Sequence, residues 1–192
     1  ASAVGWITER LGDVEFRISP ESFFQTNTLQ AERLFEVVLE EARLEEAELV
    51  YDFYCGAGSI SLLLAGAVDR VVGYEISAEA VADAEANAAR NSIRNASFVA
   101  GDLAETIASV RECPDVLICD PPRSGMHERV IERIIELAPA RIVHISCNAH
   151  TAARDLARLV HHGYELVRAR PVDLFPHTPH IECVFTLERC SS

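Results

Sequence analysis

The segment Ser146-Cys147-Asn148 contains the residue types of a nucleophilic site. It follows the apolar run Ile142–Ile145, and a helical pattern begins directly after it at Ala149. Most lone cysteines are small core residues. This cysteine, however, stands at a strand end between two polar residues, where the positive end of a helix dipole favours a thiolate. We therefore predict that it acts as a nucleophile.

A second candidate for chemistry is an acid within a predicted strand near the C-terminus. Glu182 interrupts the otherwise apolar strand expected over Ile181–Glu188. An acid in such a place is either paired or functional. His177 and His180 are three residues apart, but they lie in a Pro-flanked loop rather than a helix, so we do not interpret them as metal ligands. None of the six cysteines forms a CxxC pair, so we expect no zinc site.

Acidic residues also follow three other predicted strands. Glu75 comes 21 residues after Tyr54, close to the spacing at which an acid binds ribose hydroxyls in nucleotide sites. Asp102 follows the next strand, where it is placed to meet an adenine amine, and Asp120 precedes two prolines. A rigid turn with an incidental acid is the alternative for Asp120. Three acids at three strand ends are more than a turn requires, so we predict a ligand cleft.

The turn Gly56-Ala57-Gly58 indicates which nucleotide this cleft binds. It lacks the third glycine of the dinucleotide fingerprint GxGxxG. Asp52, at the end of the preceding strand, would repel a pyrophosphate. S-adenosylmethionine has no phosphate and carries a positive sulfonium. We therefore predict S-adenosylmethionine rather than NAD as the cofactor.

The elements that must position these residues alternate along the chain. Strand and helix patterns alternate from about Leu49 to His162, which predicts a parallel sheet with helices on both faces. Ligands bind such sheets at the carboxyl ends of the strands. The last two strands have no helix between them and are predicted to form an antiparallel hairpin at the sheet edge. The predicted strands are 49–54, 70–75, 96–100, 115–119, 141–145, 164–172 and 181–188. The predicted helices are 28–42, one from 59, 77–91, 103–110, 128–137 and 149–162, and a hairpin is expected over 6–18.

Length and composition set the outer limits. The 192 residues correspond to about one domain. The net charge of −13 argues against strong nonspecific binding of nucleic acid. No apolar run approaches the roughly 20 residues of a membrane helix, and the start has no signal-peptide pattern. Cysteines in or just after apolar strands are typical of reduced thiols, so we expect a cytoplasmic protein. The sequence does not predict the oligomeric state.

Taken together, these motifs identify a family. The chain resembles the catalytic domain of the RNA (uracil-5-)-methyltransferases, which make 5-methyluridine in tRNA and large-subunit rRNA. The match runs from about Ile7 to Arg189 over five ordered motifs. They are Ser22–Asn27 (SFFQTN), Asp52–Gly58 (DFYCGAG), Asp120–Gly125 (DPPRSG), Ser146–Asn148 (SCN) and Asp173–Thr178 (DLFPHT).

The resemblance implies a fold and a domain organisation. The fold is the α/β, Rossmann-like class I fold of S-adenosylmethionine-dependent methyltransferases, with a mostly parallel seven-stranded sheet and an antiparallel C-terminal hairpin. Residues 21–192 would form the catalytic domain, and residues 1–20 a hairpin that is the remnant of an upstream region. Relatives usually carry an OB-like RNA-binding domain first, and some hold an iron-sulfur cluster. Neither is present here and the sequence does not begin with Met, so we expect it to be part of a longer protein.

The resemblance also implies roles for individual residues. Cys147 would be the nucleophile and Glu182 the base. The residues expected to contact S-adenosylmethionine are Gln25, Tyr54, Gly56, Gly58, Ser59, Glu75, Asp102 and Asp120. Ser59 is smaller than the polar residue of many relatives. The implied partner is an RNA substrate, and Phe23-Phe24-Gln25 is slightly closer to the rRNA branch than to the tRNA branch. No metal and no membrane are implied for this segment.

The implied mechanism explains why a cysteine ends the strand. A thiolate that adds to C6 of uracil makes C5 nucleophilic, C5 takes the methyl group, and a base then removes the C5 proton. The uridine must leave its stack to reach these groups. One alternative is an amino-group methyltransferase of the N6-adenine type, whose Asp-Pro-Pro motif is followed by an aromatic residue, whereas Arg123 stands here. The other is a non-catalytic module that binds S-adenosylmethionine, against which Cys147 and Glu182 argue.

Overall fold

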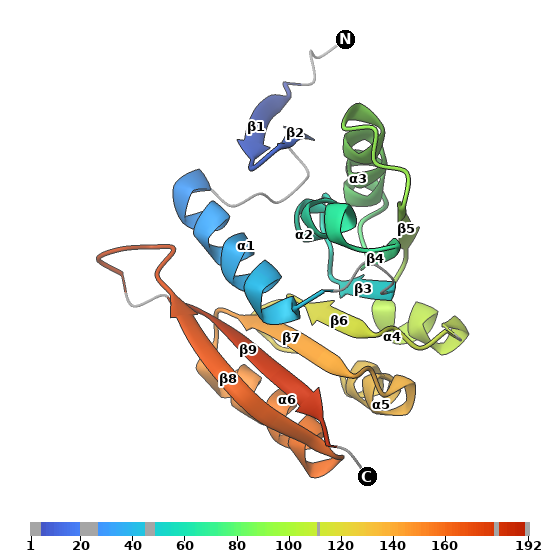
Figure 1. Ribbon diagram of the computed structural model, residues 1–192, viewed down its shortest axis with the longest axis vertical. Coiled ribbons are helices and arrows are strands. Elements are labelled where there is room, and N and C mark those ends of the chain that lie inside the picture. The colour runs from blue at the N-terminus through green and yellow to red at the C-terminus, as the bar shows by residue number, and fades with distance from the viewer. Residues whose placement is uncertain (1–4, 20–26, 45–48, 111, 179–180, 191–192) are drawn as a thin grey trace.

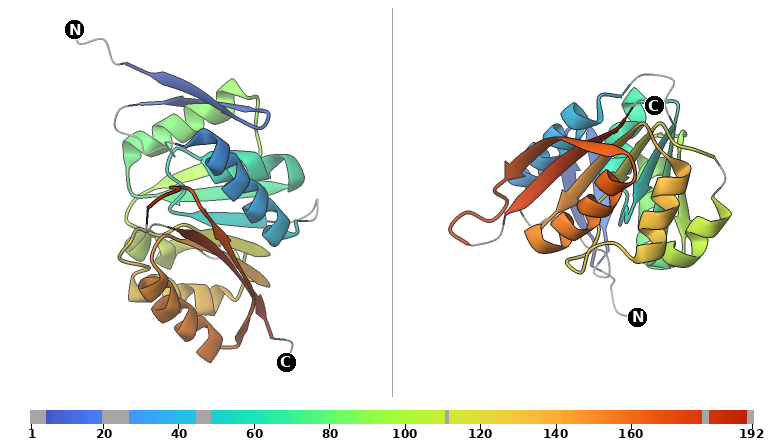
Figure 2. Two further views of the ribbon diagram at one scale, coloured as in Figure 1. Left: turned by 90° about the vertical axis from the view of Figure 1, so that its left-hand side faces the viewer. Right: turned by 90° about the horizontal axis from the view of Figure 1, so that it is seen from below.

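A seven-stranded sheet passes through the molecule and carries helices on both faces (Figures 1 and 2). The structure, a computed structural model, describes residues 5–19, 27–44, 49–110, 112–178 and 181–190. The strands of the sheet are β3 (Leu49–Phe53), β4 (Arg70–Glu75), β5 (Ala96–Ala100), β6 (Val116–Cys119), β7 (Arg141–Ser146), β8 (Tyr164–Val172) and β9 (Glu182–Arg189). The α-helices are α1 (Thr28–Ala42), α2 (Ser59–Leu64), α3 (Ala78–Arg90), α4 (Leu103–Thr106), α5 (Glu128–Leu137) and α6 (Ala149–His161).

The topology confirms the predicted fold class. The strand order is β5-β4-β3-β6-β7-β9-β8, and the five strands from β3 to β7 pair in parallel. Strand β9 runs antiparallel to both of its neighbours, β7 and β8, so the C-terminal hairpin closes the sheet as predicted. Strand β9 begins at Glu182, one residue later than predicted. The acid therefore stands at the start of the strand rather than inside it.

The two faces of the sheet bury separate hydrophobic clusters, because side chains alternate along each strand. Val50, Ile118 and Val143 face α1 and α2, whereas Tyr51 and Leu117 face α4, α5 and α6. All residues of β3 and β6 are buried, as expected for strands covered on both sides. Among the described residues, no helix combines the length and apolar character needed to cross a membrane.

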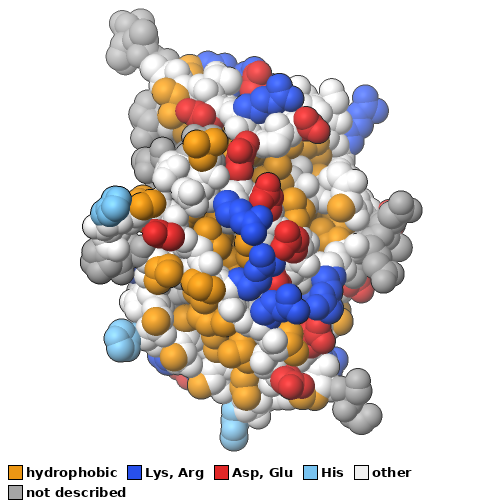
Figure 3. Space-filling view, turned by 60° about the vertical axis from the view of Figure 1, so that its left-hand side comes forward, with side chains coloured by type: hydrophobic (Ala, Val, Ile, Leu, Met, Phe, Trp, Pro, Cys, Tyr) orange, Lys and Arg blue, Asp and Glu red, His pale blue; other side chains and the backbone are white. Residues whose placement is uncertain are grey.

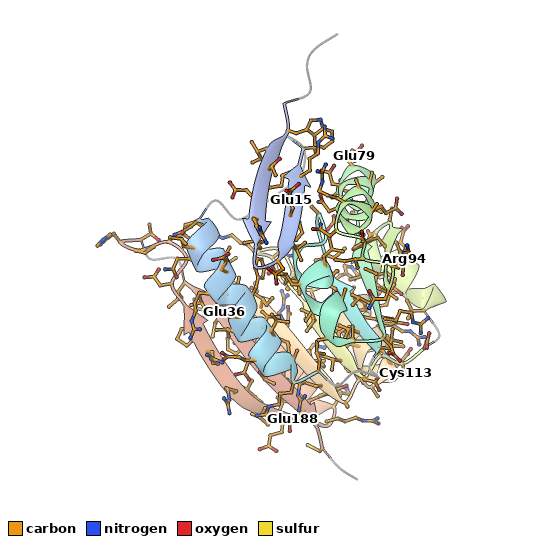
Figure 4. All side chains as sticks on the ribbon, turned by 45° about the horizontal axis from the view of Figure 1, so that its top comes forward. Glu15, Glu36, Glu79, Arg94, Cys113 and Glu188 are labelled. Atoms are coloured by element: carbon orange, nitrogen blue, oxygen red, sulfur yellow. The ribbon has the colours of Figure 1, made fainter. Side chains whose placement is uncertain are left out.

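The hairpin of β1 (Ile7–Leu11) and β2 (Val14–Ile18) pairs with helix α3 through side chains (Figure 4, where Glu15 is labelled). Polar residues four apart on α3 meet alternate residues of β2. The two spacings match, since four helical residues rise about 6 Å and two strand residues about 6.7 Å. The bonds run from Ser19 Oγ to Asp83 Oδ2 (2.6 Å), from Arg17 N to Asn87 Oδ1 (2.8 Å) and from Glu15 N to Asn91 Oδ1 (2.9 Å). The hairpin therefore packs as part of this domain.

Helix α1 is fixed across β7, β8 and β9 by charged side chains. Glu41 is 2% exposed, accepts a hydrogen bond from Thr186 Oγ1 (2.8 Å), and forms an ion pair with Arg170 (3.2 Å). Figure 3 shows basic and acidic side chains interleaved on one face of the molecule. At the amino end of β7, Arg141 Nη1 donates to the Ala42 carbonyl (2.9 Å). The start of α1 consequently lies toward the carboxyl ends of the strands.

Candidate active site

The strand register brings the predicted cofactor residues into one row. Phe53 pairs with Tyr74 on one side and with Cys119 on the other. Tyr54, Glu75 and Asp120 each come directly after one of these three residues, so they lie at the same edge of the sheet. The 21-residue interval seen in the sequence is therefore the register of β3 with β4.

The chain turns sharply where β3 ends. Tyr54 has a φ of 67°, a left-handed conformation that is uncommon for a residue with a side chain. The carbonyl of Tyr74 accepts from the backbone N–H groups of both Tyr54 (2.9 Å) and Cys55 (3.0 Å). Strained backbone that neighbouring bonds hold in place is concentrated at functional sites. The turn is thus rigid before any ligand arrives.

The two glycines of the turn serve different purposes. Gly56 has a φ of 54°, and a Cβ there would meet no atom within 4 Å, so its surface is open to a ligand. Gly58 is buried with a φ of 81°, and a Cβ there would lie 3.1 Å from both Ala84 Cβ and Phe98 Cζ. Gly58 therefore allows helix α3 and strand β5 to approach the turn.

Glu75 is held by main-chain donors on both sides. Its Oε2 accepts from Gly56 N (3.0 Å) and its Oε1 from Ser77 N (2.9 Å). Each carboxylate oxygen keeps a lone pair for another donor. A fixed carboxylate of this kind fits the hydroxyl groups of a ribose.

Two other predicted cofactor residues begin helices. Asp102 caps α4, with Oδ1 accepting from Ala104 N (2.8 Å), and its side chain is exposed. Ser59 is the first residue of α2 and is half-buried. Gln25 lies outside the described residues.

Asp52 is an unusual group beneath the turn. It is fully buried, its Oδ2 accepts from Ser61 Oγ (2.6 Å), and its Oδ1 has no hydrogen-bond partner in the described part of the chain. Burial raises the pKa of Asp52, the hydrogen bond from Ser61 lowers it, and repulsion from Glu75 raises it slightly. The net result is a pKa of about 7. Acids without a nearby cation fit a positively charged ligand and disfavour a phosphate. The contact with Ser61 was not predicted.

Two more acids interact at the other end of the row. Burial raises the pKa of Asp120 to about 7, and repulsion from Glu182 and Asp52 adds to this effect. Burial also raises the pKa of Glu182, which is 9% exposed, whereas the positive charge of Arg123 lowers it. Asp120 therefore holds its proton near neutral pH more readily than an ordinary aspartate.

The ends of β7 and β9 bring the segments of Cys147 and Glu182 to the same edge of the sheet. The paired positions of the two strands end with Ser146 opposite Cys183. Cys147 follows Ser146 and Glu182 precedes Cys183, so both residues flank the last pair of this ladder. Cys147 is half-buried, so its thiol has access to solvent. The fold therefore gathers two segments that are far apart in the sequence.

The backbone around Cys147 is fixed by its two polar neighbours. Ser146 Oγ donates to the Asn148 carbonyl and accepts from Asn148 N, both at 3.1 Å. Asn148 caps α6, with Oδ1 accepting from His150 N (3.1 Å). The helix begins at Ala149 as predicted, so the cysteine lies just before its N-terminal end.

The loop after Asp120 is attached to the same helix. Asp155 is fully buried, and its Oδ2 accepts from Met126 N (2.7 Å). Gly125 has a φ of 80°, and a Cβ there would lie only 2.6 Å from Asp155 Oδ2. These contacts were not predicted from the sequence, because nothing local in 120–127 indicates which helix it packs against.

The described residues contain no group of three or more histidines, cysteines or acids that could hold a metal ion. All six cysteines are free thiols. His177 lies in an exposed loop with a φ of 69°, and His180 lies outside the described residues.

Comparisons with known proteins identify the family of the chain. Residues 7–190 match the family model described as tRNA (Uracil-5-)-methyltransferase. An RNA methyltransferase of Porphyromonas gingivalis is 47% identical over 189 residues, which are 96% of this chain and 41% of that protein. One of Chlorobaculum tepidum is 43% identical over 194 residues, which are 98% of this chain and 40% of that protein. The chain spans about two fifths of the length of these curated relatives.

Solved structures extend the comparison to the fold. The tRNA (uracil-54, C5)-methyltransferase of Pyrococcus abyssi, solved with S-adenosyl-L-homocysteine, is 37% identical with a TM-score of 0.84, over 95% of this chain and 44% of that one. A precorrin-6y C5,15-methyltransferase of Geobacter metallireducens shares the fold at 18% identity, with a TM-score of 0.70 over 82% of this chain and 87% of that one. The family model spans nearly the whole chain, and the chain belongs to the tRNA (uracil-5-)-methyltransferase family.

Proposed function

We propose that this chain is the catalytic part of an enzyme that transfers a methyl group from S-adenosylmethionine to C5 of a uridine in RNA. The observation that carries the proposal is the ladder of β7 and β9, whose last pair, Ser146 and Cys183, is flanked by Cys147 and Glu182. Family membership supports the same chemistry.

The acidic row at the strand ends fits S-adenosylmethionine, which when bound supplies an electrophilic methyl group. Glu75 is placed to accept from the ribose hydroxyls, because both of its oxygens keep a lone pair. Asp52 and Asp120 bring no positive charge to this edge of the sheet, which favours a ligand without a phosphate. The residues proposed to hold the cofactor are Gln25, Tyr54, Gly56, Gly58, Ser59, Glu75, Asp102 and Asp120.

The proposed reaction uses Cys147 to activate the uracil ring. The thiolate forms a bond to C6, and the electrons of the C5–C6 double bond move toward the C4 carbonyl as an enolate. These electrons would return to form the bond between C5 and the methyl group of S-adenosylmethionine, while the bond from that methyl to the sulfonium sulfur would break and S-adenosylhomocysteine would leave. C5 then carries both a hydrogen and the new methyl.

Glu182 then completes the turnover. Its carboxylate takes the proton from C5, the electrons of that C–H bond restore the C5–C6 double bond, and the bond from C6 to sulfur breaks. Cys147 leaves as a thiolate. Since burial raises the pKa of Glu182, the carboxylate is a stronger base than an exposed glutamate.

The RNA must deliver an unstacked uridine to this edge of the sheet. We infer that this chain by itself binds RNA weakly, because it carries a net charge of −13. The sequence slightly favoured rRNA, whereas the matching family model and the Pyrococcus structure both name tRNA. Both RNAs are therefore substrates to test.

The proposal is tested with the protein as it is encoded, methyl-labelled S-adenosylmethionine, and separate tRNA and large-subunit rRNA. Digestion to nucleosides followed by chromatography identifies the product. Label in 5-methyluridine supports the proposal, and the RNA that carries it identifies the substrate. Label in N6-methyladenosine would establish an amino-group methyltransferase instead. Cofactor binding without label in either RNA would favour a non-catalytic module.

A further inference from the structure

The carbonyl of Arg123 is held by two side chains from the start of helix α6. Asn148 Nδ2 donates to it at 3.1 Å and Thr151 Oγ1 at 3.2 Å. Asn148 and Thr151 are far from Arg123 in the sequence, so these bonds join two separate strand ends. One of these ends, β7, leads directly to Cys147, and the other, β6, leads to Asp120.

The amide of Asn148 therefore has two separable functions. Its oxygen caps α6 by accepting from His150 N (3.1 Å), and its nitrogen donates to Arg123. A helix cap alone does not require an amide, because serine and aspartate cap helices about as well as asparagine. The nitrogen is the part of this side chain that capping leaves unexplained.

The loop that Asn148 holds contains charged residues that interact electrostatically with Glu182, the proposed base. The Arg123 side chain acts on Glu182 electrostatically, while Asp120 at the start of the same loop repels it. On the neighbouring strands, Val172 of β8 pairs with Glu182, and Ser146 of β7 pairs with the next residue, Cys183. Arg123 is the cation in this set.

We propose that Asn148 is a positioning residue, which fixes the loop of Arg123 against the nucleophile end of β7 so that the guanidinium faces Glu182. This inference rests on the proposed function, since it concerns the same base. Asn148 would then place the two halves of the reaction, thiol addition and proton removal, in one rigid unit.

Asn148→Ser separates the two functions, because serine keeps the cap and removes the donor to Arg123. We expect kcat to fall by about 10- to 100-fold, the range for a small misplacement of reacting groups. The Km for S-adenosylmethionine and the melting temperature should stay close to those of the parent. The acidic limb of the kcat pH profile should move to higher pH, since Glu182 ionises less readily without its cation.

Three matched variants sharpen this test. Arg123→Gln should move the same limb in the same direction, and Arg123→Lys should restore most of the parent profile. Thr151→Val removes the donor with the longer bond to the Arg123 carbonyl and should lower kcat less than Asn148→Ser does. If Asn148→Ser retained the parent kcat and profile, or lost cofactor affinity and stability in parallel with kcat, the proposal would be overturned.

Hydrogen exchange gives a readout that does not depend on activity. In this chain, Asn148→Ser should speed the exchange of the Gly125 N–H, which donates to the Pro122 carbonyl (2.8 Å), by about 10-fold. Protection within α6 should not change. An unchanged exchange rate at the Gly125 N–H would refute the proposal that Asn148 fixes this loop. An inactive parent protein would refute the proposed function and leave this result standing.

Discussion

The residues at the carboxyl ends of the strands are held in place differently at the two sides of the site. At β3 and β4, main-chain groups position the acids, since Glu75 accepts from the N–H groups of Gly56 and Ser77. At β6, β7 and β9, side chains from distant segments do so, as Asn148 and Asp155 hold the loop of Arg123 and Met126. The cofactor half is therefore fixed by local chain geometry and the catalytic half by tertiary contacts.

This difference has an electrostatic counterpart. Asp52 in the first half and Asp120 in the second are both acids whose pKa burial raises to about 7. In the first half, no positively charged group opposes the rise in the pKa of Asp52. In the second half, burial raises the pKa of Glu182, and the positive charge of Arg123 opposes that rise. A site that accepts a cation needs no cation of its own, but a site that removes a proton needs an ionised base.

The largest expected effect comes from the catalytic half. Cys147→Ala should lower methyl transfer by on the order of 10⁴-fold or more, the loss typical of removing a nucleophile. Binding of S-adenosylhomocysteine should not change, because the cofactor half is built without this residue. Radiolabel transfer and calorimetry measure the two quantities, with Cys190→Ala as a control at an exposed thiol. Comparable loss of affinity would show that the halves are not separate.

The next effect concerns the buried acid of the cofactor half. The folded-state pKa of Asp52, about 7, lies above its unfolded value of about 3.8. The folded state therefore binds more protons between these values, so the contribution of Asp52 to stability is present at low pH and lost as pH rises through 7. Asp52→Asn should stabilise the ligand-free chain at pH 8 by on the order of 3 kcal/mol, with little change at pH 4.

Urea unfolding across this pH range measures the difference between variant and parent. His144 acts in the opposite direction, since burial lowers its pKa to about 4, but this contribution cancels in the difference. The exposed Asp69→Asn is the control. If the variant and the parent had the same free energy of unfolding at both pH values, ionised Asp52 would not destabilise the folded state.

A smaller effect is expected at the ribose position. Glu75→Ala should weaken binding of S-adenosylhomocysteine by about 1–3 kcal/mol, the range for lost hydrogen bonds to a charged group. Glu75→Gln keeps the shape and should lose less, and the exposed Glu79→Gln should lose nothing. Calorimetry that gave the parent affinity for Glu75→Ala would remove this residue from the site.

The smallest effect lies outside both halves, at the hairpin. Asn87 is fully buried and bonds both the N–H (2.8 Å) and the carbonyl (3.1 Å) of Arg17. Asn87→Ala should cost about 1–2 kcal/mol of stability, because two backbone groups lose their partners. The more exposed Asn91→Ala should cost less. Equal costs at both positions would contradict the ladder between β2 and α3.

Sequence reasoning predicted the strands and the turn of the cofactor half because their signals are local. The alternation of strands and helices, the glycine turn and the interval from Tyr54 to Glu75 all lie within one stretch of chain, and the parallel register preserves that interval. The helix predicted over 77–91 is also found, and Ser77 caps it, with its Oγ accepting from Ala80 N (3.2 Å).

The catalytic half could be predicted only in part. Cys147 stood out as a residue at a strand end and Glu182 as an acid inside a predicted strand. The register that brings the end of β7 beside the start of β9 depends on β9 entering the sheet next to β7. The contacts of Asn148 with Arg123 and of Asp155 with Met126 join segments 25 and 29 residues apart. No local pattern encodes such pairs, because each depends on how α6 packs on the sheet.

The central claim is that Cys147 adds to the uracil and Glu182 lets it leave. The most direct measurement is a denaturing gel of the encoded protein with labelled substrate RNA and S-adenosylmethionine. With Glu182→Gln, addition and methyl transfer can proceed but the C5 proton stays, so a slow-migrating protein–RNA band should accumulate, and it should be absent from Cys147→Ala. If Glu182→Gln turns over at the parent rate and traps no RNA, Glu182 is not the base and the account is contradicted.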